Sequence, residues 1–311
     1  MVTPENKGGT WVKFVKKLGI SLLILASFLA SYWLRNDDKK ESPLAKTSEV
    51  KIVAMAPSSG EVVFALDLGN QLVGVSRFAK YPPEVADIAK VGGYLDVDLE
   101  AIVRLKPDVV VLLKEQSDLA KQLENLGMAT LFVDHMSVEG IMGSISKVGE
   151  RFDKLDEARA LRESLESRID AVRIRAQTKP DKRLLLSIGR ELGVGKVTGV
   201  VAAGAGGYHQ QLLEIAGYTN AYSGGENFPQ LSREHLLRMN PEVIIDMVNI
   251  RDAQANGIEN IMADWKSYPE LSAVKNGKVF LLVGDAHFVP GPRFVSTLEW
   301  IANCEEEGGG R

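Results

Sequence analysis

The sequence predicts an α/β protein of two lobes, each built around a parallel sheet, with a single long helix joining them. Short apolar runs alternate with helical patterns along residues 50–304, and this alternation is typical of parallel sheets. Residues 137–178 contain no proline and repeat apolar side chains at three- and four-residue steps, which predicts the linking helix. The segments on either side of that helix resemble each other.

This internal repeat pairs residues 98–111 with residues 232–245. Each copy begins with an N-cap residue, runs through a short helix to a proline, and ends in an apolar strand that should be buried on both faces. The residues shared by the two copies are Glu100 and Glu234, Arg104 and Arg238, and Pro107 and Pro241. The repeat predicts two related, Rossmann-like lobes.

Composition limits the class of protein. A chain of 311 residues is long enough to bury two cores. The net charge of −4 provides no basic footprint for nucleic acid. The single cysteine, Cys304, excludes an intrachain disulfide.

The N-terminus has the pattern of an export signal. Residues 1–17 end in lysines and are expected to stay in the cytoplasm, and the uncharged apolar residues 18–34 follow them. That run reaches the lower limit for a transmembrane helix, so an uncleaved anchor and a cleaved signal peptide both remain open. Residues 35–49 then form a polar tether outside the cytoplasm.

The first lobe is expected to span residues 50–136. It opens with a strand at 51–56, and the turn after it starts a helix in which Ser58 and Glu61 have the spacing of a capping box. Further strands are predicted at 72–76, 109–113 and 131–134.

The second lobe is expected to span residues 179–304. Strands are predicted at 183–188, 243–248 and 279–283, with helices at 208–217 and 294–303. The acidic and glycine-rich residues 305–311 are predicted to be a disordered tail.

Several short motifs, in their order and spacing, resemble the helical-backbone (class III) periplasmic substrate-binding proteins that serve ABC importers of iron–siderophores, haem and cobalamin. The resemblance covers residues 50–303, although this chain lacks the cysteine of a lipoprotein near residue 35. The motifs are Ile52-Val-Ala-Met-Ala-Pro-Ser58, Val73-Gly-Val-Ser76, Tyr81-Pro-Pro83, Val91-Gly-Gly-Tyr94, Leu99-Glu-Ala-Ile102, Leu105-Lys-Pro-Asp108, Leu212-Leu-Glu-Ile-Ala-Gly217, Pro229-Gln-Leu-Ser-Arg-Glu234 and Pro290-Gly-Pro-Arg293.

The resemblance implies roles for the two glutamates of the repeat. In the family, one acidic residue on each lobe docks on arginines of the permease dimer, and Glu100 and Glu234 occupy those positions here. The alternative is that each glutamate only favours its helix dipole, an effect of about 0.3–1 kcal/mol.

The resemblance also implies a ligand cleft between the lobes, where the loops at the carboxyl ends of both sheets meet. The ligand itself would be the metal chelate or corrinoid, with no resident cofactor. Aromatic walls suit a flat or macrocyclic ligand, and an arginine suits a ferric siderophore or a haem propionate. The implied contact residues are Phe78, Tyr94, Phe228, Asp285 and His287, with Arg77, Tyr208 and Phe288 as neighbours in the same loops. Tyr94 and His287 are candidates for haem ligation, or else ordinary contacts of their loops.

Motifs for catalysis are incomplete. Gly195 and Lys196 resemble the end of a phosphate-binding loop, but Arg190 stands where glycine is needed. No nucleophile elbow is present, and the four histidines are too scattered to indicate a zinc site. The resemblance therefore implies an extracytoplasmic solute-binding protein of an ABC importer, and the incomplete motifs do not favour an enzyme. A membrane-anchored ligand sensor and an α/β enzyme of unknown reaction are the alternatives.

Overall fold

The computed structural model of the protein describes residues 50–306. These residues lie within one compact unit, Lys46–Arg311. The predicted cytoplasmic segment, anchor helix and tether, residues 1–49, lie outside the described residues. Within residues 50–306, no helix combines the length and the apolar character needed to cross a membrane.

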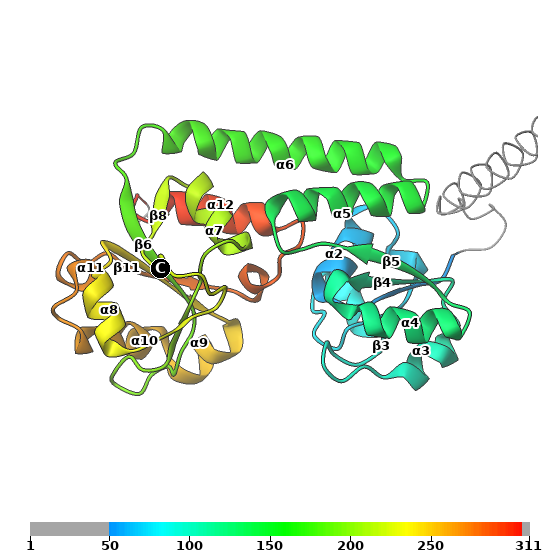
Figure 1. The fold of residues 1–311 in the computed structure, drawn as a ribbon, viewed down its shortest axis with the longest axis horizontal. Coiled ribbons are helices and arrows are strands. Elements are labelled where there is room, and N and C mark those ends of the chain that lie inside the picture. Colours follow the sequence, from blue (N-terminus) through cyan, green and yellow to red (C-terminus); the bar gives the residue numbers. More distant parts are fainter. Residues whose placement is uncertain (1–49, 307–311) are drawn as a thin grey trace, which may run out of the picture. The chain divides into compact units, whose positions relative to one another are not determined.

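The first lobe, residues 50–151, is built on a five-stranded sheet in the order β3–β2–β1–β4–β5 (Figure 1). All neighbouring strands are parallel, so their carboxyl ends lie at one edge of the sheet. The strands are β1 (Ile52–Ala54), β2 (Leu72–Val75), β3 (Ala89–Lys90), β4 (Val109–Leu113) and β5 (Ala129–Val133).

Helices cover both faces of this sheet because its strands are apolar on both sides. Ile52 and Val111 pack in the same cluster as α2 and α5, whereas Val53 and Val110 pack with α3 and α4. The helices are α2 (Pro57–Ala65), α3 (Leu99–Leu105), α4 (Ser117–Asn125) and α5 (Val138–Arg151), with short 3-10 turns at Gly69–Gln71, Pro83–Asp87 and Lys114–Gln116.

The predicted capping box at the start of α2 is wrong. Ala56 occupies the N-cap position, and its backbone N–H donates to the hydroxyl of Ser59 at 3.2 Å. The side chains of Ser58 and Glu61 do not cap the helix. They contact His135 and Arg293, which are far away in the sequence.

The second lobe, residues 182–306, has a sheet in the order β11–β10–β6–β7–β9, with β8 beside β6. The expectation of a wholly parallel sheet is wrong for this lobe, because β7 runs antiparallel to both β6 and β9. The glycine-rich segment after β6 reverses the chain through left-handed residues such as Gly193 and Gly195. The strands are β6 (Lys182–Gly189), β7 (Val200–Ala202), β8 (Tyr218–Asn220), β9 (Gln230–Leu231), β10 (Val243–Val248) and β11 (Val279–Val283).

The helices of the second lobe include the two that the sequence predicts. α7 (Tyr208–Ile215) is followed by Gly217 with φ of +83°, and α12 spans Phe294–Asn303. The others are α8 (Arg233–Met239), α9 (Ile250–Asn256), α10 (Ile258–Asp264) and α11 (Ser272–Lys275), with 3-10 turns at Trp265–Ser267 and Asp285–Phe288.

The predicted continuous helix over residues 137–178 is wrong, because the chain turns back at residues 152–154. Asp153 adopts a left-handed conformation with φ of +59°, and α6 (Leu155–Ala176) then runs alongside α5 (Figure 1). Gly149 allows the close approach, since a Cβ there would lie 2.5 Å from the Cβ of Ala158. The 22 residues of α6 are therefore the helix that joins the lobes, and one apolar cluster continues through it from sheet to sheet.

The end of the chain is also more ordered than predicted. Glu305 pairs with Lys182 at 2.7 Å and with Lys278 at 3.2 Å. Glu306 pairs with Lys179 at 2.9 Å. The prediction of a disordered tail is wrong for these two glutamates, and residues 307–311 lie outside the described residues.

The internal repeat is confirmed at the level of the backbone. α3 and α8 are each seven residues long. The side chains of Asp98 and Ser232 cap them by accepting backbone N–H groups at 2.8 and 3.3 Å. Both helices end in a left-handed residue, Lys106 or Asn240. The two copies thus use the same start and the same stop.

The correspondence extends to the neighbouring strand. The carboxylate of Asp108 accepts the backbone N–H of Lys51 at 2.8 Å, and that of Glu242 accepts the backbone N–H of Arg183 at 3.1 Å. The pairing of β1 with β4 and of β6 with β10 is also in register between the copies. Each lobe therefore presents its short helix on an equivalent frame.

Candidate functional site

The exposed aromatic side chains gather in the loops at the carboxyl ends of the two sheets. Among residues 50–306, every exposed large aromatic side chain lies in such a loop, at an exposed fraction of 38–56 %. Three of them follow β2 and β3 in the first lobe, and two follow β8 and β11 in the second. They are Phe78, Tyr81, Tyr94, Phe228 and Phe288.

The aromatic group of the first lobe is held by its neighbours. The guanidinium of Arg77 lies over the ring of Phe78, 4.9 Å from its centroid, and pairs with the carboxylate of Asp96. A Cβ at Gly93 would lie 2.7 Å from the ring of Phe78, so only glycine lets the ring occupy this place. Contacts within the first lobe thus hold Arg77 and Phe78 together in a defined position.

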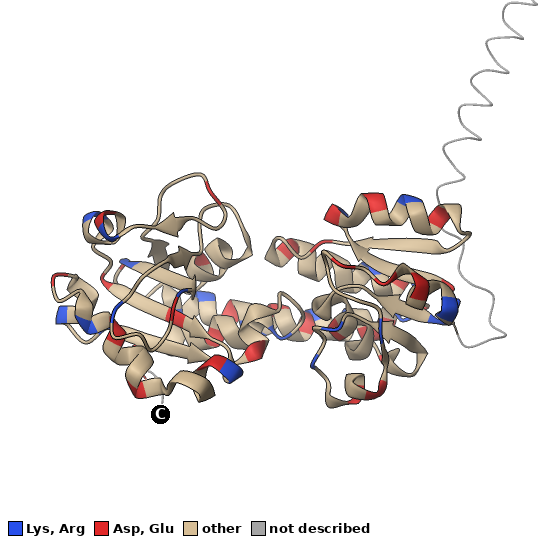
Figure 2. Cartoon of the chain, turned by 90° about the horizontal axis from the view of Figure 1, so that it is seen from below, with Lys and Arg blue, Asp and Glu red and all other residues tan. Residues whose placement is uncertain are grey.

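An ion pair links the two carboxyl edges. The Nζ of Lys80 lies 2.8 Å from Oδ2 of Asp285, and the backbone N–H of Ile250 donates to the same carboxylate at 3.1 Å. The hydrogen bond from Lys80 lowers the pKa of Asp285. Acidic and basic residues are interspersed along the ribbon of both lobes (Figure 2).

A second pair between the lobes is more buried, and the sequence did not predict it. Glu61 is 4 % exposed and accepts two hydrogen bonds from the guanidinium of Arg293, at 3.0 and 2.5 Å. Burial raises the pKa of Glu61, and Arg293 opposes that shift. The guanidinium also lies 3.8 Å from the ring centroid of Tyr81. Charge and stacking thus fix the first lobe to the loop before α12.

Two predicted contact residues have other partners. His287 lies 2.9 Å from the hydroxyl of Thr297 through Nδ1, and burial lowers its pKa. Tyr208 is only 5 % exposed and packs edge-on against Phe294 in the core. Burial raises the pKa of Tyr208, whose hydroxyl has no hydrogen-bond partner among the described residues. Tyr208 therefore lies below the surface that the exposed aromatics form.

A serine and a histidine meet behind the first-lobe edge. The Nδ1 of His135 lies 2.5 Å from the hydroxyl of Ser58, and both residues are less than 5 % exposed. Burial lowers the pKa of His135 to about 4. Without exposure to solvent this pair cannot reach a substrate, so it braces β5 against α2 and does not form a nucleophilic centre.

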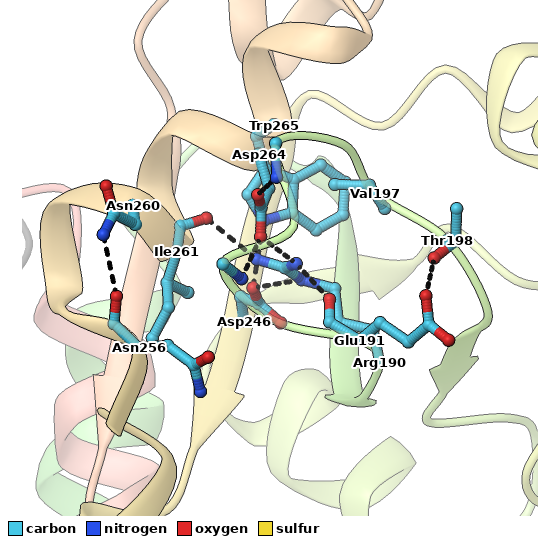
Figure 3. A network of polar contacts seen from close by, with 12 residues as sticks. Arg190, Glu191, Val197, Thr198, Asp246, Asn256, Asn260, Ile261, Asp264 and Trp265 are labelled. Atoms are coloured by element: carbon cyan, nitrogen blue, oxygen red, sulfur yellow. Dashed lines mark hydrogen bonds and ion pairs between the residues drawn. The ribbon is translucent and has the colours of Figure 1, made fainter. Parts of the chain in front are cut away.

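Arg190 lies in a fully buried ionic network in the second lobe (Figure 3). It contacts Asp246 and Asp264, each at 2.8 Å. The backbone N–H groups of Gly193 and Gly195 donate to Asp264 at 2.7 Å. In a phosphate-binding loop such amides face the ligand. Here a carboxylate of the protein occupies them, which explains why the motif around Gly195 and Lys196 is not a nucleotide site.

No metal centre is formed by the residues that the structure describes, since none of their groups of acidic, histidine or cysteine side chains could hold an ion. Three cavities of about 300, 460 and 440 Å³ lie elsewhere, two along α5 and α6 and one beside α8. None of the eight predicted ligand-contact residues lines these three cavities.

Comparison with known proteins identifies the family to which the chain belongs. Residues 52–286 match the family model described as periplasmic binding protein. An ABC transporter substrate-binding lipoprotein of Bacillus subtilis is 26% identical over 86% of this chain and 83% of its own. The vitamin B12-binding protein of Photorhabdus laumondii is 24% identical over 96% of this chain and 99% of its own.

A solved structure supports the same fold. The periplasmic heme-binding protein RhuT of Roseiflexus sp. RS-1, in its apo form, superimposes with a TM-score of 0.70. It is 22% identical, and the match covers 82% of this chain and 97% of the other. This likeness shows that the two-lobed architecture is shared.

Proposed function

Because the chain belongs to the periplasmic binding protein family, we propose that it is the extracytoplasmic solute-binding protein of an ABC importer and that it holds a corrinoid between its lobes. The family is one of solute-binding proteins and not of enzymes. The observation that carries the proposal is the gathering of the exposed aromatics, Phe78, Tyr81, Tyr94, Phe228 and Phe288, on the carboxyl-end loops of both lobes.

Aromatic side chains in this place suit a large, flat ligand. Phe and Tyr bury a large apolar area and lose little conformational entropy, because each has only two side-chain torsions. The wall of Phe78 and Arg77 is already ordered by Asp96 and Gly93. A rigid macrocycle placed against it would cost little reorganisation of the protein.

The charges favour a ligand with neutral edges over an anionic chelate. Three cations beside the aromatics are each already paired with a carboxylate: Arg77 with Asp96, Lys80 with Asp285, and Arg293 with Glu61. An anionic ligand would have to compete for these cations, whereas the amide side chains of a corrinoid need only hydrogen bonds. The vitamin B12-binding relative of Photorhabdus laumondii is consistent with this choice.

Delivery would use the equivalent glutamates of the two lobes. Glu100 and Glu234 lie in the first turns of α3 and α8, and both are exposed. The hydroxyl of Ser232 donates to Glu234 at 2.8 Å and lowers its pKa, so this side chain stays charged. Two carboxylates on equivalent frames would set the register on a permease dimer that presents arginines.

Haem is the second candidate, and two exposed residues favour it. Arg251 lies in the first turn of α9, next to the amide that contacts Asp285, and its charge suits a propionate. Tyr94 is 48 % exposed, which leaves its hydroxyl accessible to an iron atom. His287 suits this role less well because Thr297 engages its ring.

A tryptophan-fluorescence titration of residues 46–311 tests the proposal. This segment forms its own compact unit and retains Trp265 and Trp300. Cyanocobalamin, haem and ferric siderophores would be added separately. We expect saturable quenching by cyanocobalamin with a micromolar or lower Kd. Binding of haem alone would favour the second candidate, and no binding of any ligand would contradict the substrate class.

A further inference from the structure

The second lobe has a cavity beside its short helix α8 that includes cationic side chains. The cavity measures about 440 Å³. Three of its nine lining residues are basic and none is acidic. The basic residues are Arg183, His235 and Arg238, and Leu231 and Met239 are among the others.

One of the cations is fixed at the wall by the end of α8. The guanidinium of Arg183 donates to the backbone oxygen of Met239 at 2.7 Å and to that of Asn240 at 3.1 Å. These carbonyls belong to the last turn of the helix, where a positive charge is favourable. Arg183 thus has a defined position, although its charge has no carboxylate partner among the described contacts of its guanidinium.

The second cation differs between the two copies of the repeat. In the first lobe, Arg104 lies 3.5 Å from Glu100, four residues earlier on α3. In the second lobe, Glu234 accepts a hydrogen bond from Ser232 instead. Arg238 lines the cavity and has no ion pair among the described residues. The same sequence positions therefore give a self-compensated pair on one lobe and an uncompensated cation on the other.

We propose that this cavity is a socket for an acidic side chain of the permease, so that the second lobe docks through an acid and a cationic socket together. The inference rests on the proposed docking role of Glu234, which lies one turn before Arg238 on the same exposed helix. Arg183 and Arg238 match a carboxylate in charge and geometry. Leu231 and Met239 provide apolar wall for its aliphatic stem. The first lobe has Lys51 in the place of Arg183, and its Arg104 faces Glu100.

The socket makes docking asymmetric between two lobes whose frames are equivalent. A permease surface that offers an arginine and an acidic residue would satisfy the second lobe fully, whereas the first lobe needs only the arginine. Complementary and mismatched charges of this kind select orientation and partner. The expected partner residue is an aspartate or glutamate one helical turn from the arginine that receives Glu234.

A direct test uses the small carboxylate N-acetylglutamate and does not need the permease. The Nε–Hε signal of Arg238 would be followed by ¹⁵N NMR of residues 46–311, with the α-amide of N-acetylglutamine, which has no carboxylate, as the neutral control. We expect a saturable shift of Arg238 with N-acetylglutamate only, and no shift of Arg104. Equal shifts with both compounds, or none with either, would overturn the socket.

A second test uses the intact protein and its permease in lipid nanodiscs. We expect Arg238→Gln to weaken docking about tenfold, while the matched Arg104→Gln changes it less than about twofold. Both variants should bind solute as the wild type does. Equal docking of the two variants would overturn the socket alone. Failure of the wild type to dock would instead contradict the proposed function.

Discussion

The two copies of the internal repeat have the same backbone design and different surroundings. Both α3 and α8 begin at a capping side chain, end in a left-handed residue and lead into a buried strand. In the first copy, Glu100 and Arg104 form an ion pair within the helix. The second copy leaves Arg238 beside a cavity. Equivalent frames can therefore present equivalent acids while differing in what else they offer a partner.

The interiors of the two lobes also differ, because among residues 50–306 only the second sheet contains a buried ionic network. Apolar side chains of β4 pack on both faces of the first sheet. In the second lobe, strand β10, which lies between β11 and β6, has a buried charge, Asp246, which Arg190 and Trp265 contact at 2.8 and 3.0 Å (Figure 3). The network secures the reversed chain after β6 that makes this sheet mixed. An ionic network thus accompanies the departure from a parallel sheet.

The largest expected difference between the lobes is in the cost of removing an arginine. Arg190→Leu leaves Asp246 and Asp264 buried without their cation, and we expect a loss of about 3–5 kcal/mol in unfolding free energy. Arg104→Leu removes an exposed pair and should cost less than about 1 kcal/mol. Urea unfolding followed by circular dichroism measures both. Equal losses would contradict a structural role for the network.

The next difference concerns pH. The pKa of His135 is about 4 in the folded protein and 6.5 ordinarily, so the unfolded chain binds the proton first as the pH falls. The stabilisation from neutral His135 is complete above pH 6.5 and is lost progressively down to pH 4. The total is about 3–4 kcal/mol, at about 1.4 kcal/mol for each pKa unit.

Unfolding free energies measured between pH 4 and 7 test this. His135→Asn should reduce the pH dependence whatever its effect at neutral pH, and His209, whose pKa burial also lowers to about 4, should keep its own share of the slope. A His135→Asn variant with an unchanged slope would show that another group titrates.

The smallest expected effect is the loss of unfolding free energy when an N-cap is removed, and it should be the same in both copies of the repeat. Asp98→Ala and Ser232→Ala each remove one N-cap hydrogen bond, and we expect each to lower the unfolding free energy by about 1 kcal/mol. Urea unfolding of the single and double variants measures this. Values that differ by more than about 1 kcal/mol would mean that the frames are not energetically equivalent.

Local patterns predicted much of this fold. The repeat, helices α7 and α12, and all strands except β3, β7, β8 and β9 follow from apolar spacing and capping residues, which act over a few neighbours. The resemblance implied the loop positions of Phe78, Tyr94, Phe228 and Phe288, and the structure shows all four side chains exposed in those loops.

The features that local patterns missed depend on distant contacts. Glu61 and Arg293 are 232 residues apart, and nothing near either one indicates the other. The sequence did not predict the break between α5 and α6 at Asp153, because Phe152 and Leu155 continue the apolar period across it. Tyr208 was placed in the ligand loops by its neighbours, yet its ring enters the core against Phe294. Ligand identity likewise depends on the spacing of side chains from both lobes.

The most direct test of the account is the heat of binding of cyanocobalamin to residues 46–311 and to one wall variant from each lobe. Phe78→Ala and Phe228→Ala change exposed rings, so both variants should fold. If the ligand lies between the lobes, each variant should lose about tenfold in affinity, near 1.4 kcal/mol, with one site retained. Wild-type affinity in both variants would contradict a site formed by the two aromatic walls.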